Sequence, residues 1–435
     1  MRIVFITPGT GSYYCGVCMR DNTIIARLRQ DGHDAVILPM YLPMLTDEPS
    51  MSEGMPIFFG GINVYLQQKT GIFRHTPAWF DRLLDSPSLL RFVSRNSGMT
   101  EGADLGDLTL SMLRGESGNQ FKEVERLVGW LRERPKPDLI YLSTALQIGL
   151  ARRLRDEYEA PVFCFLQGED EFIESLNRDA REQAWSILSE RAEAVSGFIA
   201  PSRYFAEVMR ERINLPKDRV RVIPNGINLE GYRPHPGLPD PPAIGFLARL
   251  TEAKGLGVLV DAFIHLRNPG RAKNISRCRL AIAGSSTGAD AAFIAEQKRK
   301  LNVAGLTPDV TFRENPDRTD KLDFLRGLSL FSVPATYGEA FGLYLIEAMA
   351  SGVPVVQPPR GSYPEIVAET GGGEIYQSDT PEGLASAWEG LLLQPDRIRS
   401  LAAAAREAAV ERFGVDSMTS ALLDTCEHWN DGVME

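Results

Sequence analysis

Two glutamates in the second half of the chain have the spacing of a ligand-binding pair. Glu339 lies in a loop that ends near Gly342, and Glu347 lies about one turn into a helix predicted over 343–350. Carboxylates accept paired hydroxyl groups well, and exposed backbone amides at 341–343 can bind phosphate or sugar oxygens at the helix start. The spacing therefore predicts that both acids face one hydroxyl-bearing ligand at different points along it.

Two cations follow a predicted strand over 243–247. Arg249 and Lys254 are five residues apart in the loop after this strand, where a cation pair suits a diphosphate. The whole chain has 47 Lys and Arg against 57 Asp and Glu, a formal net charge of −10. That balance argues against a nucleic-acid partner. In such an acidic chain, an anionic ligand needs locally placed cations.

The loop over 9–18 follows the first predicted strand, over 2–7, and precedes a helix predicted over 21–30. This is the place of a phosphate cradle, although a plain glycine-rich turn remains an alternative. Tyr14 stands where a dinucleotide fingerprint has its third glycine, and no acid follows the strand predicted over 34–39. A nicotinamide or flavin cofactor is therefore disfavoured.

Cysteine usage points to a reducing compartment. The chain has five cysteines, an odd and low number, and neither a signal-peptide core nor an apolar run long enough for a membrane span. Cys15 and Cys18 form a C-x-x-C at a helix start, which a redox pair or half a zinc site would use. Packed thiols are the favoured interpretation, and a cytoplasmic location is expected.

An acidic run follows the strand predicted over 161–166. Gly168 to Glu171 contains three consecutive acids, which would suit either a divalent metal or the first turn of a helix. The helix start is the favoured interpretation, and no metal is predicted.

Short, continuous apolar strands alternate with helices on both sides of a proline-rich joint at 223–242. This pattern predicts α/β architecture with two doubly wound parallel sheets, which bind ligands at the carboxyl ends of their strands. Two such domains imply a cleft between them. Residues 43–137 interrupt the alternation and are interpreted as an acceptor-facing insertion or a surface elaboration.

The segment around Glu339 resembles the retaining GT-B glycosyltransferases, in particular glycosyltransferase family 4. The resemblance rests on Glu339-x7-Glu347 and on the order and spacing of further pieces along most of the chain. These pieces are Gly32-His33, Ala200-Pro201-Ser202, Pro224-Asn225-Gly226, Arg249…Lys254, Ala283-Gly284, Phe341-Gly342-Leu343, Glu347-Ala348-Met349-Ala350-x-Gly352-x-Pro354 and Pro364-Glu365.

The resemblance implies roles for the charged residues. Arg249 and Lys254 would bind the donor diphosphate and stabilise the leaving nucleoside diphosphate. Glu347 would bind the ribose hydroxyls, and Glu339 the transferred sugar. Retention in this family is ascribed to front-face attack assisted by the leaving phosphate, with no dedicated protein base. Because two cations would already stabilise the diphosphate, no metal or other cofactor is expected.

The resemblance also implies contacts with the nucleotide-sugar donor that are made by backbone amides or that depend on the absence of a side chain. Amides of Phe341, Gly342 and Leu343 would bind the sugar or the distal phosphate. The base would lie near Arg313, with Gly284 leaving room beside it. The Gly-Gly pair of the family's first loop corresponds to Cys15-Gly16 here. Gly16 still allows the ligand to approach the backbone closely, whereas Cys15 adds a side chain.

Other departures from the family pattern lie on the acceptor or sugar side. Gln167 replaces a frequent histidine, and the strand over 138–142 ends in Tyr141-Leu142-Ser143. Gln167 and Asp170 are the acceptor-side candidates. A strand at Pro56–Tyr65 is expected, because the insertion resembles the first domain of the glycogen- and starch-synthase-like branch.

The GT-B resemblance assigns residues 1–235 to an acceptor-side Rossmann-like domain and 236–414 to a nucleotide-sugar domain. It assigns 415–435 to a helix that returns to the first domain. The expected activity moves a hexose from a nucleotide diphosphate sugar, UDP-sugar favoured over ADP- or GDP-sugar, to a carbohydrate or other hydroxyl acceptor. A silent GT-B scaffold, a GT-B epimerase and a thiol-redox protein are the alternatives. Membrane association is open, and Lys69–Arg91 is interpreted as a solvated helix.

Overall fold

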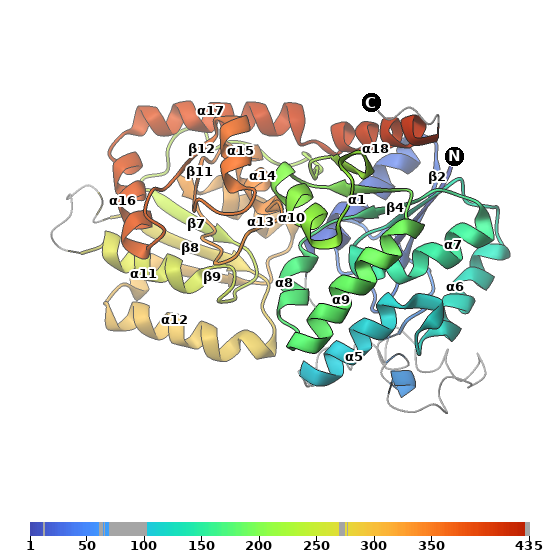
Figure 1. Cartoon of the computed structure of the whole chain (residues 1–435). Coiled ribbons are helices and arrows are strands. Elements are labelled where there is room, and N and C mark those ends of the chain that lie inside the picture. Colours follow the sequence, from blue (N-terminus) through green and yellow to red (C-terminus); the bar gives the residue numbers. More distant parts are fainter. Residues whose placement is uncertain are drawn as a thin grey trace. The chain divides into compact units, whose positions relative to one another are not determined.

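The computed structural model describes residues 1–11, 14–60, 64, 66–68, 102–268, 275 and 277–430 (Figure 1). The chain divides into two compact units, Met1–Pro224 with Met418–Glu435, and Asn225–Ser417. The helix predicted over Lys69–Arg91 lies outside the described residues. The predicted domain boundaries at 235/236 and 414/415 stay predictions.

The first unit is built on a parallel sheet of six strands in the order β2-β1-β3-β4-β5-β6. Its strands are β1 (Arg2–Thr7), β2 (Asp34–Pro39), β3 (Leu139–Leu142), β4 (Val162–Phe165), β5 (Gly197–Ala200) and β6 (Val220–Val222). Its helices before the second unit are α1 (Gly16–Gln30), α5 (Gly102–Leu113), α6 (Phe121–Arg132), α7 (Ala151–Tyr158), α8 (Glu169–Glu174), α9 (Arg178–Arg191) and α10 (Arg203–Ile213).

A layer of aromatic side chains fills one face of this sheet. The ring of Tyr141 lies 4.6 Å from that of Phe5 and 5.4 Å from that of Phe165, centroid to centroid. The last helix, α18 (Val415–Asn430), packs Leu422 and Cys426 into the same core. The Tyr141 hydroxyl lies 2.8 Å from the Cys426 sulfur, so the buried phenol has a polar partner on this helix.

The second unit contains another six-stranded parallel sheet, in the order β12-β11-β10-β7-β8-β9. Its strands are β7 (Ala243–Leu247), β8 (Arg279–Gly284), β9 (Val310–Glu314), β10 (Leu330–Phe331), β11 (Val355–Gln357) and β12 (Gly373–Ile375). Its helices are α11 (Leu256–Leu266), α12 (Ala291–Val303), α13 (Arg318–Arg326), α14 (Leu343–Ala350), α15 (Tyr363–Thr370), α16 (Pro381–Leu392) and α17 (Pro395–Arg412). Helix α11 packs against α16, and α14 packs against α17 (Figure 1).

Both strand orders reverse once. The chain runs outward from β7 to β9, then returns to pair β10 with the other side of β7. In the first unit the same reversal lies between β1 and β3. Open α/β sheets bind ligands outside the carboxyl ends of the two strands that flank such a reversal. The expected doubly wound α/β architecture is confirmed.

The strand expected at Pro56–Tyr65 is wrong where the structure describes it. Residues 56–60 form no strand, and Val64 is helical. The Arg126 side chain donates hydrogen bonds to the carbonyls of Ile57 and Phe58 at 2.6 and 2.7 Å. A side chain from α6 therefore satisfies the carbonyls that a neighbouring strand would have taken. Helix α1 also begins at Gly16 rather than near residue 21, so Cys15 is its N-cap.

Gly284, the last residue of β8, allows a close backbone contact. Its φ is 154°, and a Cβ there would lie 1.6 Å from the carbonyl oxygen of Ala248. We expect Gly284→Ala to lower the free energy of unfolding by about 2 kcal/mol, because the loop after β7 must move. Urea unfolding followed by circular dichroism measures this. Gly288→Ala is the control, since a Cβ there meets no atom within 4 Å. Equal stability of both variants would contradict the prediction.

Candidate functional site

The loops after β7 and β10 touch backbone to backbone at the reversal in the second sheet. The amide of Thr336 donates to the carbonyl of Ala253 at 2.9 Å. Gly255 caps α11 with φ 78°, and a Cβ there would lie 1.8 Å from the carbonyl oxygen of Pro334. A side chain at Gly255 would therefore separate the loops that carry Lys254 and Glu339.

Lys254 and Glu339 meet in a cluster with three tyrosines, which we call the Lys–Glu–Tyr cluster (Lys254, Glu339, Tyr337, Tyr344 and Tyr363). The ammonium lies 2.5 Å from Glu339 Oε2 and also donates to the Tyr337 hydroxyl. Tyr337 and Tyr344 donate to the same carboxylate oxygen at 3.0 and 2.7 Å. The hydroxyls of Tyr344 and Tyr363 are 2.7 Å apart. Three donors thus converge on one carboxylate oxygen.

This arrangement keeps Glu339 ionised. Burial by itself would raise the pKa of Glu339, but the charge of Lys254 and the hydrogen bonds from Lys254, Tyr344 and Tyr337 lower the pKa below its usual value. Burial and the Glu339 charge raise the pKa of Tyr344, so its hydroxyl stays a donor. The cluster therefore presents a fixed anion beside a fixed cation.

Glu347 has a different set of partners. It is 6 % exposed, and its Oε1 accepts from the Tyr232 hydroxyl at 2.9 Å and from the Lys321 ammonium at 2.5 Å. Lys321 comes from α13 and Tyr232 from the segment before β7. Glu347 is therefore oriented by groups distant in the sequence, and its predicted contact with ribose hydroxyls stays a prediction.

Arg249 lies near Asp290, an acid in the segment between β8 and α12. Its guanidinium lies 3.9 Å from Asp290 Oδ2, and 42 % of its side chain is exposed. Arg313 is exposed near the end of β9, opposite Ala283 in the register of β8 and β9. The carboxyl ends of three neighbouring parallel strands thus carry Arg249 after β7, Gly284 at the end of β8 and Arg313 near the end of β9. Glu339 lies at the same side of the sheet, in the loop after β10.

The predicted amide donors surround the start of α14. Gly342 is the N-cap with φ 86°, and Leu343 is the first helical residue. Phe341 is buried, its ring 6.1 Å from that of Phe413, and its carbonyl accepts from the Ser362 hydroxyl at 3.0 Å. The first amides of a helix have no carbonyl partner within the helix. Those of α14 therefore remain candidates for anion contact.

The remaining candidates belong to the first unit. Gly16 begins α1, and Gln167 and Asp170 follow β4. The neighbouring Glu169 accepts from the Thr144 hydroxyl at 2.7 Å and from the Gln167 amide at 2.7 Å, so it joins the loops after β3 and β4. Burial raises the pKa of Asp170 to about 6. Among the described residues no group of three acids, cysteines or histidines has the arrangement of a metal site.

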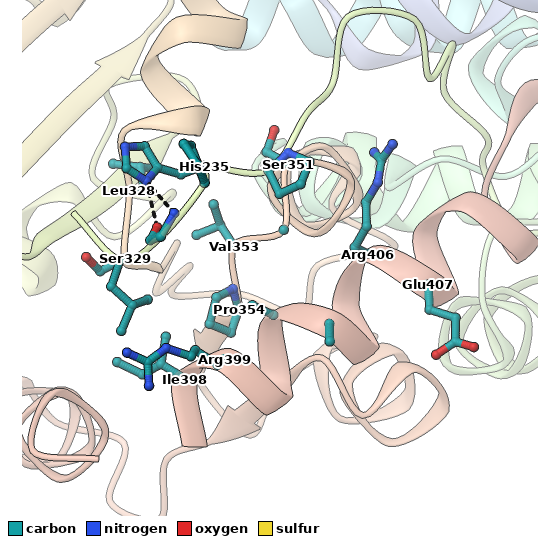
Figure 2. Close-up of a pocket in the computed structure, with 17 residues that line it drawn as sticks. His235, Leu328, Ser329, Ser351, Val353, Pro354, Ile398, Arg399, Arg406 and Glu407 are labelled. Carbon is teal, nitrogen blue, oxygen red and sulfur yellow. Dashed lines mark hydrogen bonds between the residues drawn. The ribbon is translucent and has the colours of Figure 1, made fainter. Parts of the chain in front are cut away.

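A pocket of about 450 Å³ in the second unit lies elsewhere (Figure 2). Its lining includes Leu328 and Ser329 before β10, and Val353 and Pro354 before β11. It therefore opens at the amino ends of these strands, and none of the predicted site residues lines it. In the described part of the chain, no helix is both long and apolar enough to cross a membrane.

Several site residues were missed by sequence reasoning. Tyr337 and Tyr344 stand within the recognised segment, but nothing in their spacing shows that they donate to Glu339. Lys321 is 26 positions from Glu347 and gives no local signal. Gly361 has φ 59°, and a Cβ there would lie 2.4 Å from the Glu339 amide nitrogen.

Two family models match adjoining parts of the chain. Residues 101–230 match Glycosyltransferase Family 4, and residues 231–408 match the glycosyl transferases of group 1. Among solved structures, sucrose-phosphate synthase from Thermosynechococcus elongatus has a TM-score of 0.71 at 17 % identity and covers 100 % of both chains. HepE from Anabaena, solved with UDP, has a TM-score of 0.67 at 18 % identity, covering 98 % of this chain and 100 % of its own.

The fold is thus that of the GT-B glycosyltransferases. This chain belongs to them as a glycosyltransferase of the family 4 type. It is 26 % identical to the D-inositol 3-phosphate glycosyltransferase of Xylanimonas cellulosilytica, over 84 % of this chain and 91 % of that one. It is 29 % identical to the phosphatidyl-myo-inositol mannosyltransferase of Mycobacterium leprae, over 47 % of this chain and 52 % of that one.

The Lys–Glu–Tyr cluster makes stability depend on pH. We expect Lys254→Met to lower the free energy of unfolding at neutral pH by about 2 kcal/mol, because Glu339 loses a charged donor while buried. Lys298→Met, which breaks a half-exposed pair with Glu314, should cost about 0.5 kcal/mol.

The difference between wild type and Lys254→Met should shrink as the pH falls. In the variant, Lys254 no longer opposes the effect of burial on the pKa of Glu339. As the pH falls, Glu339 therefore takes up a proton at a higher pH in the variant than in the wild type. The wild type loses its advantage later, as the pH falls through the lowered pKa of Glu339. Urea unfolding at several pH values measures this, and a difference independent of pH would contradict it.

Proposed function

We propose that this protein transfers a hexose from a nucleotide diphosphate sugar to a hydroxyl group of an acceptor, with retention of the anomeric configuration. The observation that carries the proposal is the Lys254–Glu339 pair at the reversal of the second sheet. A cation beside an ionised, oriented acid suits a ligand that joins a diphosphate to a sugar. UDP in the Anabaena structure supports a UDP-sugar ahead of ADP- or GDP-sugars.

In the proposed reaction the second unit holds the donor. Arg249 and Lys254 would stabilise the negative charge that develops on the leaving diphosphate, the kind of electrostatic effect that contributes most to many enzymes. Glu339 would accept hydrogen bonds from the transferred sugar. Glu347, which is oriented by Lys321, would accept hydrogen bonds from the ribose hydroxyls. The step as proposed needs neither a metal nor a protein base.

The acceptor side is proposed for Gln167 and Asp170. The names of two relatives contain an inositol phosphate and a phosphatidylinositol, which supports a polyol hydroxyl as one acceptor to test beside carbohydrates. A cytoplasmic location is also proposed, because none of the five cysteines is in a disulfide. Membrane association remains to be tested by vesicle flotation.

Binding of the diphosphate can be measured separately from the reaction. We expect Arg249→Ala to weaken UDP binding about tenfold or more, which is about 1.4 kcal/mol, and to leave uridine binding unchanged. Arg299→Ala is the control, because this exposed arginine pairs with Glu296 on the same helix. Isothermal titration calorimetry with UDP, ADP and GDP gives the affinities. Absence of binding by all three would favour a silent scaffold.

The reaction itself tests Glu339. With UDP-glucose and an inositol phosphate or oligosaccharide acceptor, Glu339→Gln should lower kcat about 100-fold or more, while Glu296→Gln should not. UDP binding by Glu339→Gln verifies that the variant is folded. Proton NMR of the product should show the anomer of the donor, and EDTA should not reduce the rate. An inverted anomer would contradict retention, and epimerised free sugar would indicate an epimerase.

A further inference from the structure

The start of α1 brings two thiols together. Cys15 is the N-cap of the helix, with φ −111° and ψ 127°, and Cys18 is the third residue of its first turn. Side chains at these two positions face each other, the geometry that capping boxes use. Cys15 is half-buried, whereas Cys18 is fully buried. One thiol is therefore accessible and the second lies behind it.

The two thiols have unequal acidity. A hydrogen bond from the Cys18 thiol lowers the pKa of Cys15 to about 7, against the opposing effect of burial. The same hydrogen bond, together with burial, raises the pKa of Cys18 well above its usual value. Near neutral pH Cys15 is thus substantially a thiolate while Cys18 keeps its proton. Thiolates are the reactive form.

A buried carboxylate lies next to this pair. Asp21 follows Cys18 by three residues, hence on the same face of α1, and both side chains are inaccessible to solvent. Asp21 Oδ1 is paired with Arg20 at 2.5 Å, whereas Asp21 Oδ2 has no hydrogen-bond partner among the described residues. Burial raises the pKa of Asp21, opposed by the charge of Arg20 and by the Ser143, Arg20 and Thr7 side chains. The charge of Asp21 in turn raises the pKa of Cys18, so this buried carboxylate is close enough to be assigned as the acceptor of the Cys18 proton.

We propose that Cys15 and Cys18 are a redox-active thiol pair that exchanges with small-molecule disulfides. The Cys15 thiolate attacks one sulfur of the disulfide RSSR, forms a Cys15–S–S–R bond and expels RS⁻. Cys18 then gives its proton to Asp21, attacks the Cys15 sulfur and expels the second RS⁻. The released thiolates take up the two protons that the protein thiols lose. The protein is oxidised by two electrons, and RSSR is reduced to two RSH.

This modification site is separate from the proposed transfer reaction. Its chemistry requires only the two thiols and Asp21, and its readout is the mass of the protein. Oxidation of the pair would nevertheless affect one predicted donor-binding residue, because Gly16 lies between the two cysteines in the sequence. A Cys15–Cys18 bond would fix the first turn of α1, to which the predicted donor contact of Gly16 belongs.

Trapping of the mixed disulfide tests the proposal. With oxidised glutathione at pH 7.5, Cys18→Ser should gain one glutathione at Cys15, identified by intact mass and peptide mapping. Wild type should instead lose two hydrogens and two titratable thiols without a lasting adduct. Cys15→Ser should show neither change. Cys278→Ala, which removes a buried thiol of the second unit, should behave as wild type.

Asp21→Asn separates the two steps. The first attack should not slow, because the charge of Asp21 raises the pKa of Cys15 and its removal favours the thiolate. The second attack should slow about tenfold or more, so that the glutathione adduct of the full-length protein accumulates. Thermal melts establish that each variant is folded. A folded Cys18→Ser protein that takes up no glutathione, or a wild type that keeps a stable adduct, would overturn the proposal.

Discussion

A backbone contact between two loops determines the geometry of the candidate donor site. The loop after β7 and the loop after β10 belong to neighbouring strands on opposite sides of the chain reversal, so nothing in a doubly wound sheet requires them to touch. They do touch, because Gly255 leaves the carbonyl of Pro334 unobstructed and Thr336 bonds to Ala253. This contact positions the lysine of one loop against the glutamate of the other.

The two glutamates of the site follow one electrostatic rule. Each is largely withdrawn from water, and each accepts from a lysine of another segment. Tyrosine hydroxyls add to this, from the same loop and helix for Glu339 and from the segment before β7 for Glu347. An isolated buried carboxylate would take up a proton, whereas Glu339, whose pKa is lowered by Lys254 and by its hydroxyl donors, remains an anion. The local placement of Lys254 and Lys321 therefore matters more to this site than the net charge of −10.

Features that depend on local sequence pattern could be predicted from the sequence. Apolar runs and proline-rich breaks predicted the parallel sheets, and spacing located the loop of Glu339 and the helix of Glu347. The sequence could not predict contacts that depend on how elements pack. The pairing of Lys321 with Glu347, the divergence of Arg249 towards Asp290 and the donors on Glu339 arise from tertiary packing. The expected strand was wrong at the described residues 56–60 for a similar reason, since Arg126 donates to the carbonyls of Ile57 and Phe58.

Each sheet is parallel and reverses its strand order once, but the two reversals differ in the charged residues beside them. In the first unit Arg20, on the helix that follows β1, is buried, paired with Asp21 and stacked 4.0 Å over the ring of Phe165. A guanidinium neutralised in this way contributes little attraction for a phosphate. In the second unit Arg249 is partly exposed and Lys254 lies in a loop beside an oriented acid. This asymmetry supports the proposal that the donor diphosphate binds at the second sheet.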